Sequence, residues 1–202
     1  NCILPDWFLK LPKKGVLNVH PSLLPSLRGA SPIRTAIKDN LVDDIGVTVM
    51  LLDQEMDHGP ILEQEQFVPN VNKWPLSGPQ LDEFLAKMGG RLLADVLPAW
   101  MNDELASQEQ DHDSATYCGK LKKADSELNI DPLKLPTGKY ATICWHTIQA
   151  FAGIGETFFV HENKRVKITK AERTTGGSLR LLRVIPEGKS EMDFSQYLQS
   201  LN

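Results

Sequence analysis

The chain has 202 residues, of which 41% are hydrophobic and 24% are charged, with a formal net charge of −4. This is an ordinary soluble composition with enough apolar residues for one sizeable core or two smaller ones. No apolar run approaches the roughly 20 residues of a membrane span, so the sequence predicts no transmembrane helix, and we expect no membrane partner. Three scattered cysteines without a Cys-x-x-Cys pair argue against a disulfide framework or a zinc site, and the absence of a signal-peptide pattern also predicts a cytoplasmic protein.

Charge is unevenly distributed along the chain. Up to Thr116 there are 9 Lys and Arg against 17 Asp and Glu, whereas from Tyr117 onward there are 13 against 9. An acidic first part and a basic second part predict two domains, the second facing a polyanion, although ordinary surface variation would give a similar imbalance. The polar, aperiodic stretch after residue 102 predicts a linker. We therefore expect domains at 1–104 and 125–202, joined by a linker at 105–124.

Hydrophobic spacing and capping residues predict alternating strands and helices in the first domain. We expect strands at 16–20, 45–53 and 60–68, and helices at 6–11, 32–38 and 77–97. The nearly all-apolar run 45–53 predicts a strand at the centre of a sheet, buried on both faces. Gly89-Gly90 interrupts the last helix and weakens the prediction that it is unbroken.

In the second domain, the same signals predict a helix, then short strands, then a final helix. The expected elements are a helix at 139–151, strands at 157–160, 165–171 and 178–184, and a helix from 190–193 to 201. Short strands separated by turns favour a small β-barrel.

The most informative stretch is 17–32, which contains Asn18 and His20. These two residues lie two apart, on one face of the strand that ends at His20 and near its carboxyl end. In open parallel sheets, ligands bind in the crevice beyond the carboxyl ends of the strands. Asp57 follows the next apolar strand, and a right-handed crossover would bring the two strand ends together. We therefore expect Asp57 to lie close to Asn18 and His20.

The pattern Asn18-x-His20-x-Ser-Leu-Leu-Pro-x-x-Arg28-Gly29 resembles the signature of the folate-dependent formyltransferases, and every fixed position is filled. By overall pattern the chain is similar to the members that formylate methionyl-tRNA. The resemblance implies a formyltransferase with 10-formyltetrahydrofolate as the formyl donor and no metal. It assigns catalysis to Asn18, His20 and Asp57, and folate binding to Ile3, Leu4, Pro5, Ser22, Leu23, Leu24 and Pro25.

Each of these residues also has a purely structural explanation. An Asn at a strand end often forms a turn, a His in an apolar setting is often a satisfied core residue, and Asp57 before Gly59 could only cap a loop. Arg28 could contact the acceptor or a phosphate, or it could brace its loop through backbone carbonyls. His58 beside Asp57 could suggest a metal site, but no second ligand cluster supports one.

The segment from Tyr117 to Asp131 resembles the entry to the second domain of the methionyl-tRNA members. Sugar formyltransferases can show a similar segment. Lys120, Lys122 and Lys123 are the candidates for RNA phosphate contacts, and a solvated basic turn is the alternative. The resemblance implies an α/β fold, namely the C-terminal half of a Rossmann-like formyltransferase domain followed by a small, shortened OB-like barrel.

The expected reaction transfers a formyl group to the α-amine of methionine on initiator tRNA, and we expect a monomer. One alternative is a sugar-nucleotide N-formyltransferase. Another is an inactive fragment that retains folate or RNA binding. The first half of the usual family domain is absent, and a sheet beginning here would expose an apolar edge. For this reason we expect the sequence to be part of a longer chain.

Overall fold

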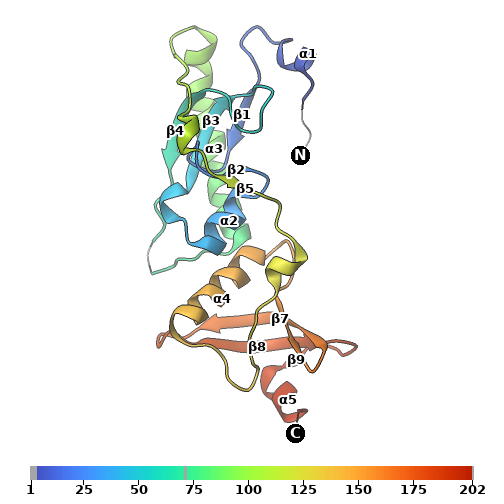
Figure 1. The fold of residues 1–202 in the computed structure, drawn as a ribbon. Helices are drawn as coiled ribbons and strands as arrows, with labels where there is room; N and C mark the ends of the chain where they lie inside the picture. The colour runs from blue at the N-terminus through green and yellow to red at the C-terminus, as the bar shows by residue number, and fades with distance from the viewer. Residues whose placement is uncertain (1–3, 71, 202) are drawn as a thin grey trace.

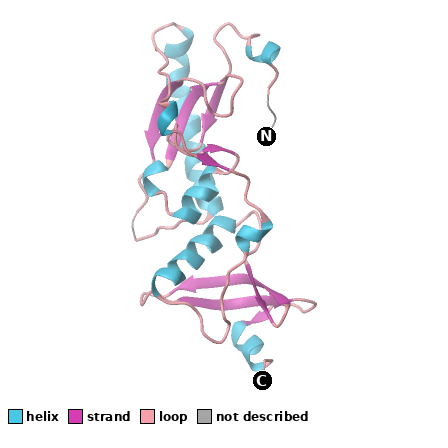
Figure 2. Cartoon of the chain, viewed as in Figure 1, coloured by secondary structure: helices cyan, strands magenta, loops and turns pink. Residues whose placement is uncertain are grey.

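The computed structural model describes residues 4–70 and 72–201, arranged as two lobes that follow one another along the chain (Figure 1). The first lobe combines a sheet with helices, and the second places a long helix beside an antiparallel sheet (Figure 2). Each lobe has its own cluster of buried apolar side chains. No helix within the described ranges is long and apolar enough to cross a membrane.

The first lobe is built on a sheet with the strand order β1-β3-β4. Its strands are β1 (Leu17–His20), β3 (Gly46–Leu51) and β4 (Ile61–Gln66). The expected central position of the all-apolar strand is confirmed, because β3 lies between the other two and its first five residues are buried. Two-residue strands β2 (Arg28–Gly29) and β5 (Tyr117–Cys118) pair in parallel beside this sheet.

The expected parallel direction of the first two long strands is wrong. β1 runs antiparallel to β3, so His20 lies opposite Thr48, and Leu51 at the end of β3 lies opposite Leu17. The carboxyl ends of these strands are therefore at opposite ends of the pair. A helix between two strands is compatible with either direction, so the crossover rule for parallel strands did not decide this case.

Helices of the first lobe are α1 (Asp6–Leu9), α2 (Pro32–Asp39) and α3 (Gly78–Met101). They begin near their predicted starts, but α1 ends at Leu9 rather than at 11, and α3 continues to Met101 rather than ending at 97. Pro32 occupies the first turn of α2, and Asn40 closes the helix in the left-handed conformation with φ 57°. Ser77 and Gln80 form a capping box at the start of α3.

Gly89 explains why α3 continues unbroken through two glycines. A Cβ on Gly89 would lie 2.5 Å from Cγ1 of Val19 on β1, whereas a Cβ on Gly90 would meet nothing within 4 Å. The helix can therefore approach β1 closely only because residue 89 has no side chain. This contact supports the strand that carries Asn18 and His20.

The second lobe has a sheet of order β6-β7-β8-β9, with every neighbouring pair antiparallel. Its strands are β6 (Phe158–His161), β7 (Lys164–Arg173), β8 (Leu179–Pro186) and β9 (Met192–Asp193), and its helices are α4 (Gly138–Phe151) and α5 (Phe194–Gln199). Within the described residues this sheet, β6-β7-β8-β9, is open, so the small OB-like barrel stays a prediction.

Short 3-10 turns lie outside these sheets, at Val42–Asp44, His112–Ser114 and Lys123–Ser126.

The two lobes meet where α4 packs on α2. His146 of α4 is buried, and its Nδ1–H donates a hydrogen bond of 2.7 Å to the carbonyl of Ile37 in α2. Burial is the largest cause of a lowered pKa for His146, which favours the neutral ring. Ala150, further along α4, joins the apolar cluster of the first lobe.

The glycine pair in α3 gives a test of this packing. We expect Gly89→Ala to destabilise the chain by about 1–3 kcal/mol, because the new methyl group overpacks against Val19. Gly90→Ala, one residue away, should instead stabilise it by roughly 0.5–1 kcal/mol, because alanine has the higher helix propensity and the site is open. Urea unfolding of both variants measures the difference, and equal effects of the two substitutions would contradict the close contact.

Candidate active site

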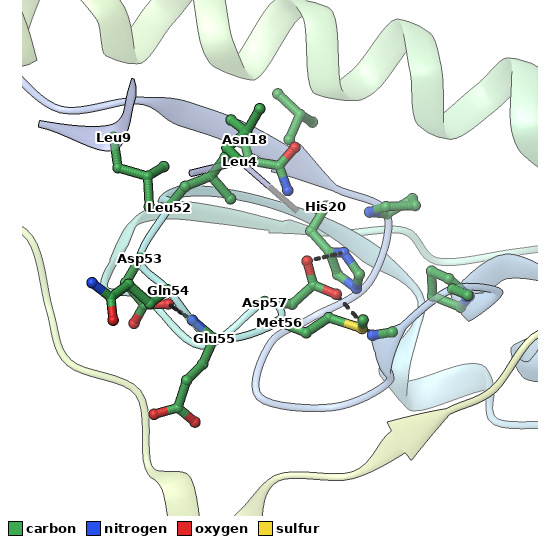
Figure 3. Close-up of a pocket in the computed structure, with 15 residues that line it drawn as sticks. Leu4, Leu9, Asn18, His20, Leu52, Asp53, Gln54, Glu55, Met56 and Asp57 are labelled. Carbon is green, nitrogen blue, oxygen red and sulfur yellow. Dashed lines mark hydrogen bonds and ion pairs between the residues drawn. The ribbon is translucent and has the colours of Figure 1, made fainter. Parts of the chain in front are cut away.

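Asn18, His20 and Asp57 line one cavity of about 480 Å³. Asn18 and His20 come from β1, and Asp57 comes from the loop between β3 and β4. Figure 3 shows the Asn18 amide, the His20 ring and the Asp57 carboxylate around the same hollow, with Asp57 facing His20. The structure thus brings the three sequence-predicted catalytic residues together.

The route that brings Asp57 to His20 differs from the expected one. Because β3 ends far from His20, the loop Leu52–Pro60 must fold back along β1. Its base is closed by the Leu51 N–H, which donates to the Pro60 carbonyl at 2.9 Å. Gly59 fits there because a Cβ would overlap the carbonyl of Leu51.

His20 is 4% exposed and is held from one side by the backbone. Its Nε2 lies 3.1 Å from the carbonyl oxygen of Leu27. A carbonyl only accepts, so Nε2 carries the proton and Nδ1 is left to face Asp57 Oδ1 at 3.5 Å. Burial lowers the pKa of His20, while the Asp57 carboxylate and the Leu27 carbonyl oppose that shift. The resting ring is therefore neutral near pH 7, with its free nitrogen directed at a carboxylate.

Asp57 is fixed by its own backbone conformation and by a main-chain donor. Its φ is 53°, in the left-handed region that is uncommon for residues other than glycine, although aspartate adopts it more often than most. Its Oδ2 accepts a hydrogen bond of 2.8 Å from the N–H of Gly29 on β2. Gly29 has φ 121°, and a Cβ there would overlap the carbonyl of Cys118 on β5. The parallel pairing of β2 and β5 therefore positions this donor.

The rest of the cavity wall is apolar toward the N-terminal segment and polar toward the loop. Leu4 and Leu9 line it from the N-terminal side. This side is tied to the loop because Gln54 Nε2 donates to Asp6 Oδ1 at 2.7 Å. The remaining lining residues are Val19, Pro21, Gly29, Ala30, Pro32, Leu52, Asp53, Gln54, Glu55 and Met56.

Among the predicted folate-binding residues that are described, Leu4 lines this cavity and Pro5 does not; Ile3 lies outside the described residues. The Ser-Leu-Leu-Pro stretch lies outside the wall as well. Ser22 is fully buried and donates to the Ser26 carbonyl at 2.6 Å. Thr48 on β3 donates to the Ser22 carbonyl and accepts from the Leu24 N–H. In this structure the stretch fastens the loop after β1 to the central strand.

Arg28 is 1% exposed, and its guanidinium contacts other side chains. It donates to Gln110 Oε1 from Nε at 3.1 Å and from Nη2 at 2.7 Å. Further contacts reach the Tyr117 hydroxyl at 3.3 Å and His112 Nδ1 at 2.9 Å. This geometry favours the bracing explanation, made through side chains rather than backbone carbonyls.

Gln110 is the residue that the sequence reasoning missed. It is 5% exposed, and its Nε2 donates to the carbonyls of Asp57 at 3.0 Å and Gly59 at 2.7 Å. Its position in a polar, aperiodic stretch expected to be a linker hid it. No local pattern separates a buried glutamine in such a stretch from the exposed ones beside it.

Lys120, Lys122 and Lys123 are exposed in the segment between the lobes. Lys120 also lines a second cavity of about 830 Å³. This cavity shares Pro21, Ala30, Pro32 and Met56 with the first. The two cavities therefore adjoin one another.

His58 is occupied by contacts within its own loop and with the interlobe segment. Its Nδ1 lies 2.6 Å from Asp53 Oδ2, and its ring stacks on His112 with 3.9 Å between centroids. Within residues 4–70 and 72–201, no group of three or more His, Cys, Asp or Glu side chains is arranged to hold a metal ion.

The comparisons identify the α/β lobe as a formyl-transferring domain. Residues 1–73 match the family model described as formyl transferase. The methionyl-tRNA formyltransferase of Syntrophomonas wolfei is 30% identical over 219 residues, which are 98% of this chain and 67% of that protein. The chain belongs to the formyltransferase family of enzymes.

Other relatives match over shorter stretches. Two methionyl-tRNA formyltransferases are 42% identical to this chain, but the chain spans only 40% and 48% of their length. Among solved structures, the methionyl-tRNA formyltransferase from Clostridium thermocellum has a TM-score of 0.62 at 17% identity, covering 96% of this chain and 74% of that one. The N-formyltransferase from Helicobacter canadensis, solved with folinic acid and dTDP-3-aminofucose, has a TM-score of 0.57 at 19% identity, covering 82% and 65%.

The opposing influences on His20 predict how stability depends on pH. Its folded pKa is lowered below the ordinary value of 6.5, so the unfolded chain takes up a proton first as the pH falls. The stability contributed by the neutral ring is complete above about pH 6.5 and is lost progressively below it, down to the folded pKa. When the pH is lowered from 7.5 to 5.5, the free energy of unfolding measured with urea should fall less for His20→Gln than for the unsubstituted chain. Equal losses would contradict the buried neutral ring.

Proposed function

We propose that the chain transfers a formyl group from 10-formyltetrahydrofolate to the α-amine of methionine on initiator tRNA. The observation that carries this proposal is the convergence of Asn18, His20 and Asp57 on one cavity from separate segments. The methionyl-tRNA formyltransferases that match at 30–42% identity support the choice of acceptor. Folinic acid in the Helicobacter canadensis structure supports a folate donor.

The chemistry needs a proton acceptor and a donor for a developing oxyanion. The amine nitrogen attacks the formyl carbon, a C–N bond forms, and the carbonyl electron pair moves onto the oxygen. The Asn18 amide is a neutral donor that can stabilise this oxyanion without giving up a proton. As the intermediate collapses, the bond from the formyl carbon to N10 of the folate breaks, and N10 takes up a proton.

The His20–Asp57 pair is suited to accept the proton that the amine loses. Since Nε2 donates to Leu27, only Nδ1 of His20 is available, and it faces Asp57 Oδ1. A neutral ring and an ionised carboxylate meet here without a proton between them, so one added proton satisfies both groups. Once protonated, Nδ1 becomes a second donor in the cavity.

Two adjoining cavities fit a reaction between two large substrates. The first is about 480 Å³, large enough for a bicyclic ring system, and its apolar side is formed by Leu4 and Leu9. We assign the folate ring to this cavity, which Leu4 lines, with Pro5 and the loop 22–25 shaping its surroundings. We assign the approach of the acceptor to the second cavity, which contains Lys120.

Substitution of the trio Asn18, His20 and Asp57 tests the proposal directly. Asp57→Asn or His20→Ala should lower kcat for formylation of methionyl-initiator tRNA by about 10²–10⁴-fold, since each removes a proton-transfer group. Asn18→Ala should lower it by about 10²–10³-fold through loss of the oxyanion donor. Asn129→Ala, an exposed change in the second lobe, is the control.

Three outcomes would contradict parts of the proposal. An Asp57→Asn variant at the unsubstituted rate would remove the proton-transfer role. Formylation of a nucleotide-linked amino sugar in place of tRNA would change the acceptor class. Binding of tetrahydrofolate without transfer to either acceptor would favour the inactive alternative.

The exposed lysines between the lobes give a separate test of the RNA partner. Lys122→Glu should weaken tRNA binding and make the salt dependence of the affinity shallower, because a phosphate contact releases counterions when it forms. Lys13→Glu makes the same charge change on an exposed residue before β1 and serves as the control. If both variants bind tRNA with the same affinity and salt slope, Lys122 makes no phosphate contact.

A further inference from the structure

Gln110 is a buried side chain in a stretch whose neighbours are exposed. It is 5% exposed, while residues 106–109 and 111–114 are exposed. The chain before it is fastened to the start of β4 by two backbone bonds between Gln108 and Ile61, of 2.7 and 2.8 Å. This bridge places Gln110 beside the loop that carries Asp57.

The chemistry of its partners fixes the orientation of the Gln110 amide. A guanidinium can only donate, so Oε1 must face Arg28, from which it accepts two hydrogen bonds. Backbone carbonyls can only accept, so the NH₂ group must face Asp57 and Gly59. The oxygen of the amide thus accepts two hydrogen bonds and its NH₂ group donates two, and the reversed orientation would lose all four.

The two carbonyls that Gln110 holds are those of Asp57, whose φ is 53°, and of Gly59, two residues later. The Gly29 N–H holds the carboxylate of Asp57 from the other side. A residue in the left-handed conformation can relax to a more common one unless its surroundings prevent this. Gln110 supplies that restraint on the main chain, 53 positions away in the sequence.

We propose that Gln110 is a positioning residue that keeps the Asp57 carboxylate facing His20 by holding the main chain at Asp57 and at Gly59, two residues later. This proposal rests on the proposed function, because it assigns a role in the same transfer. Gln110 lies outside the cavity lining and contacts no reacting atom.

The chemistry of the pocket around Gln110 predicts what glutamate would do there. Arg28 is 1% exposed, and its hydrogen-bond partners among the described side chains are Gln110, Tyr117 and His112. The carboxylate introduced by Gln110→Glu would gain an ion pair with Arg28, but its second oxygen would face two carbonyl oxygens in place of a donor. The fold should tolerate this substitution, while the turn at Asp57 should lose its restraint.

The experiment compares Gln110→Glu with Gln108→Glu, which makes the same chemical change on an exposed side chain two residues away. We expect Gln110→Glu to lower kcat about 10–100-fold with KM for 10-formyltetrahydrofolate within about threefold, because misplacement of a catalytic group by about 1 Å costs this much. Gln108→Glu should keep both constants. In an Asp57→Asn background, Gln110→Glu should change kcat no more than about twofold, since the group that it positions is already gone.

A second readout does not require transfer activity. Asp57→Asn is introduced into three chains, namely the unsubstituted chain, Gln108→Glu and Gln110→Glu. In each chain, NMR titration of His20 measures how far Asp57→Asn lowers the pKa of the ring. Using the difference within each chain cancels the added charge of the glutamate. We expect a clear drop in the first two chains and a drop less than half as large with Gln110→Glu.

These readouts separate the proposal from the proposed function. Absence of formylation by the unsubstituted chain would defeat the function, and the NMR difference would still decide the role of Gln110. Equal NMR differences in all three chains, or a kcat unaffected by Gln110→Glu, would overturn that role. If Gln110→Glu lowers Tm below the assay temperature, Gln110→Met, which is close in volume and adds no charge, replaces it in every comparison.

Discussion

The hydrogen bonding of buried polar groups around Asp57 is the constraint on which the site depends. The loop after β3 has to turn back along β1, and this leaves Gly59 buried and Asp57 half-buried. Carbonyls there need a donor, and Gln110 donates to those of Asp57 and Gly59. The N–H of Gly29 donates to the carboxylate of Asp57. In such surroundings a hydrogen bond is strong and a missing partner is costly, so the arrangement is well specified.

The protonation state of His20 follows from its own burial. Loss of solvent favours the neutral ring, and the carboxylate of Asp57 favours the charged one. Because these influences oppose one another, the ring rests neutral yet has a place for one proton next to a negative charge. The backbone contact with Leu27 decides which nitrogen is free, and β1 directs that nitrogen toward the cavity. Position and protonation state are thus set by one set of contacts.

The sequence predicted the elements of this fold better than their arrangement. The apolar run of β3, Pro32 and Asn40 around α2, and the apolar face of α3 are local signals, and the structure has each element near its expected limits. Strand direction is not a local property, and β1 proved antiparallel to β3. Convergence of Asp57 with His20 was expected from the motif, but the assumed route through parallel strand ends was wrong.

Residues whose role comes only from distant partners could not be predicted in the same way. Ser22 and Leu24 belong to the signature, yet in the structure they bond to Thr48 and to their own loop. Gln110 lies in a stretch that resembles a linker in composition. That stretch is held at the Gln108 bridge, at Gln110 and at the pairing of β5 with β2, so the segment leading to Lys120 begins from a fixed point beside the first cavity. With α4 packed on α2, the second lobe is fixed relative to the same strands, and a large acceptor held there would meet the trio in a defined orientation.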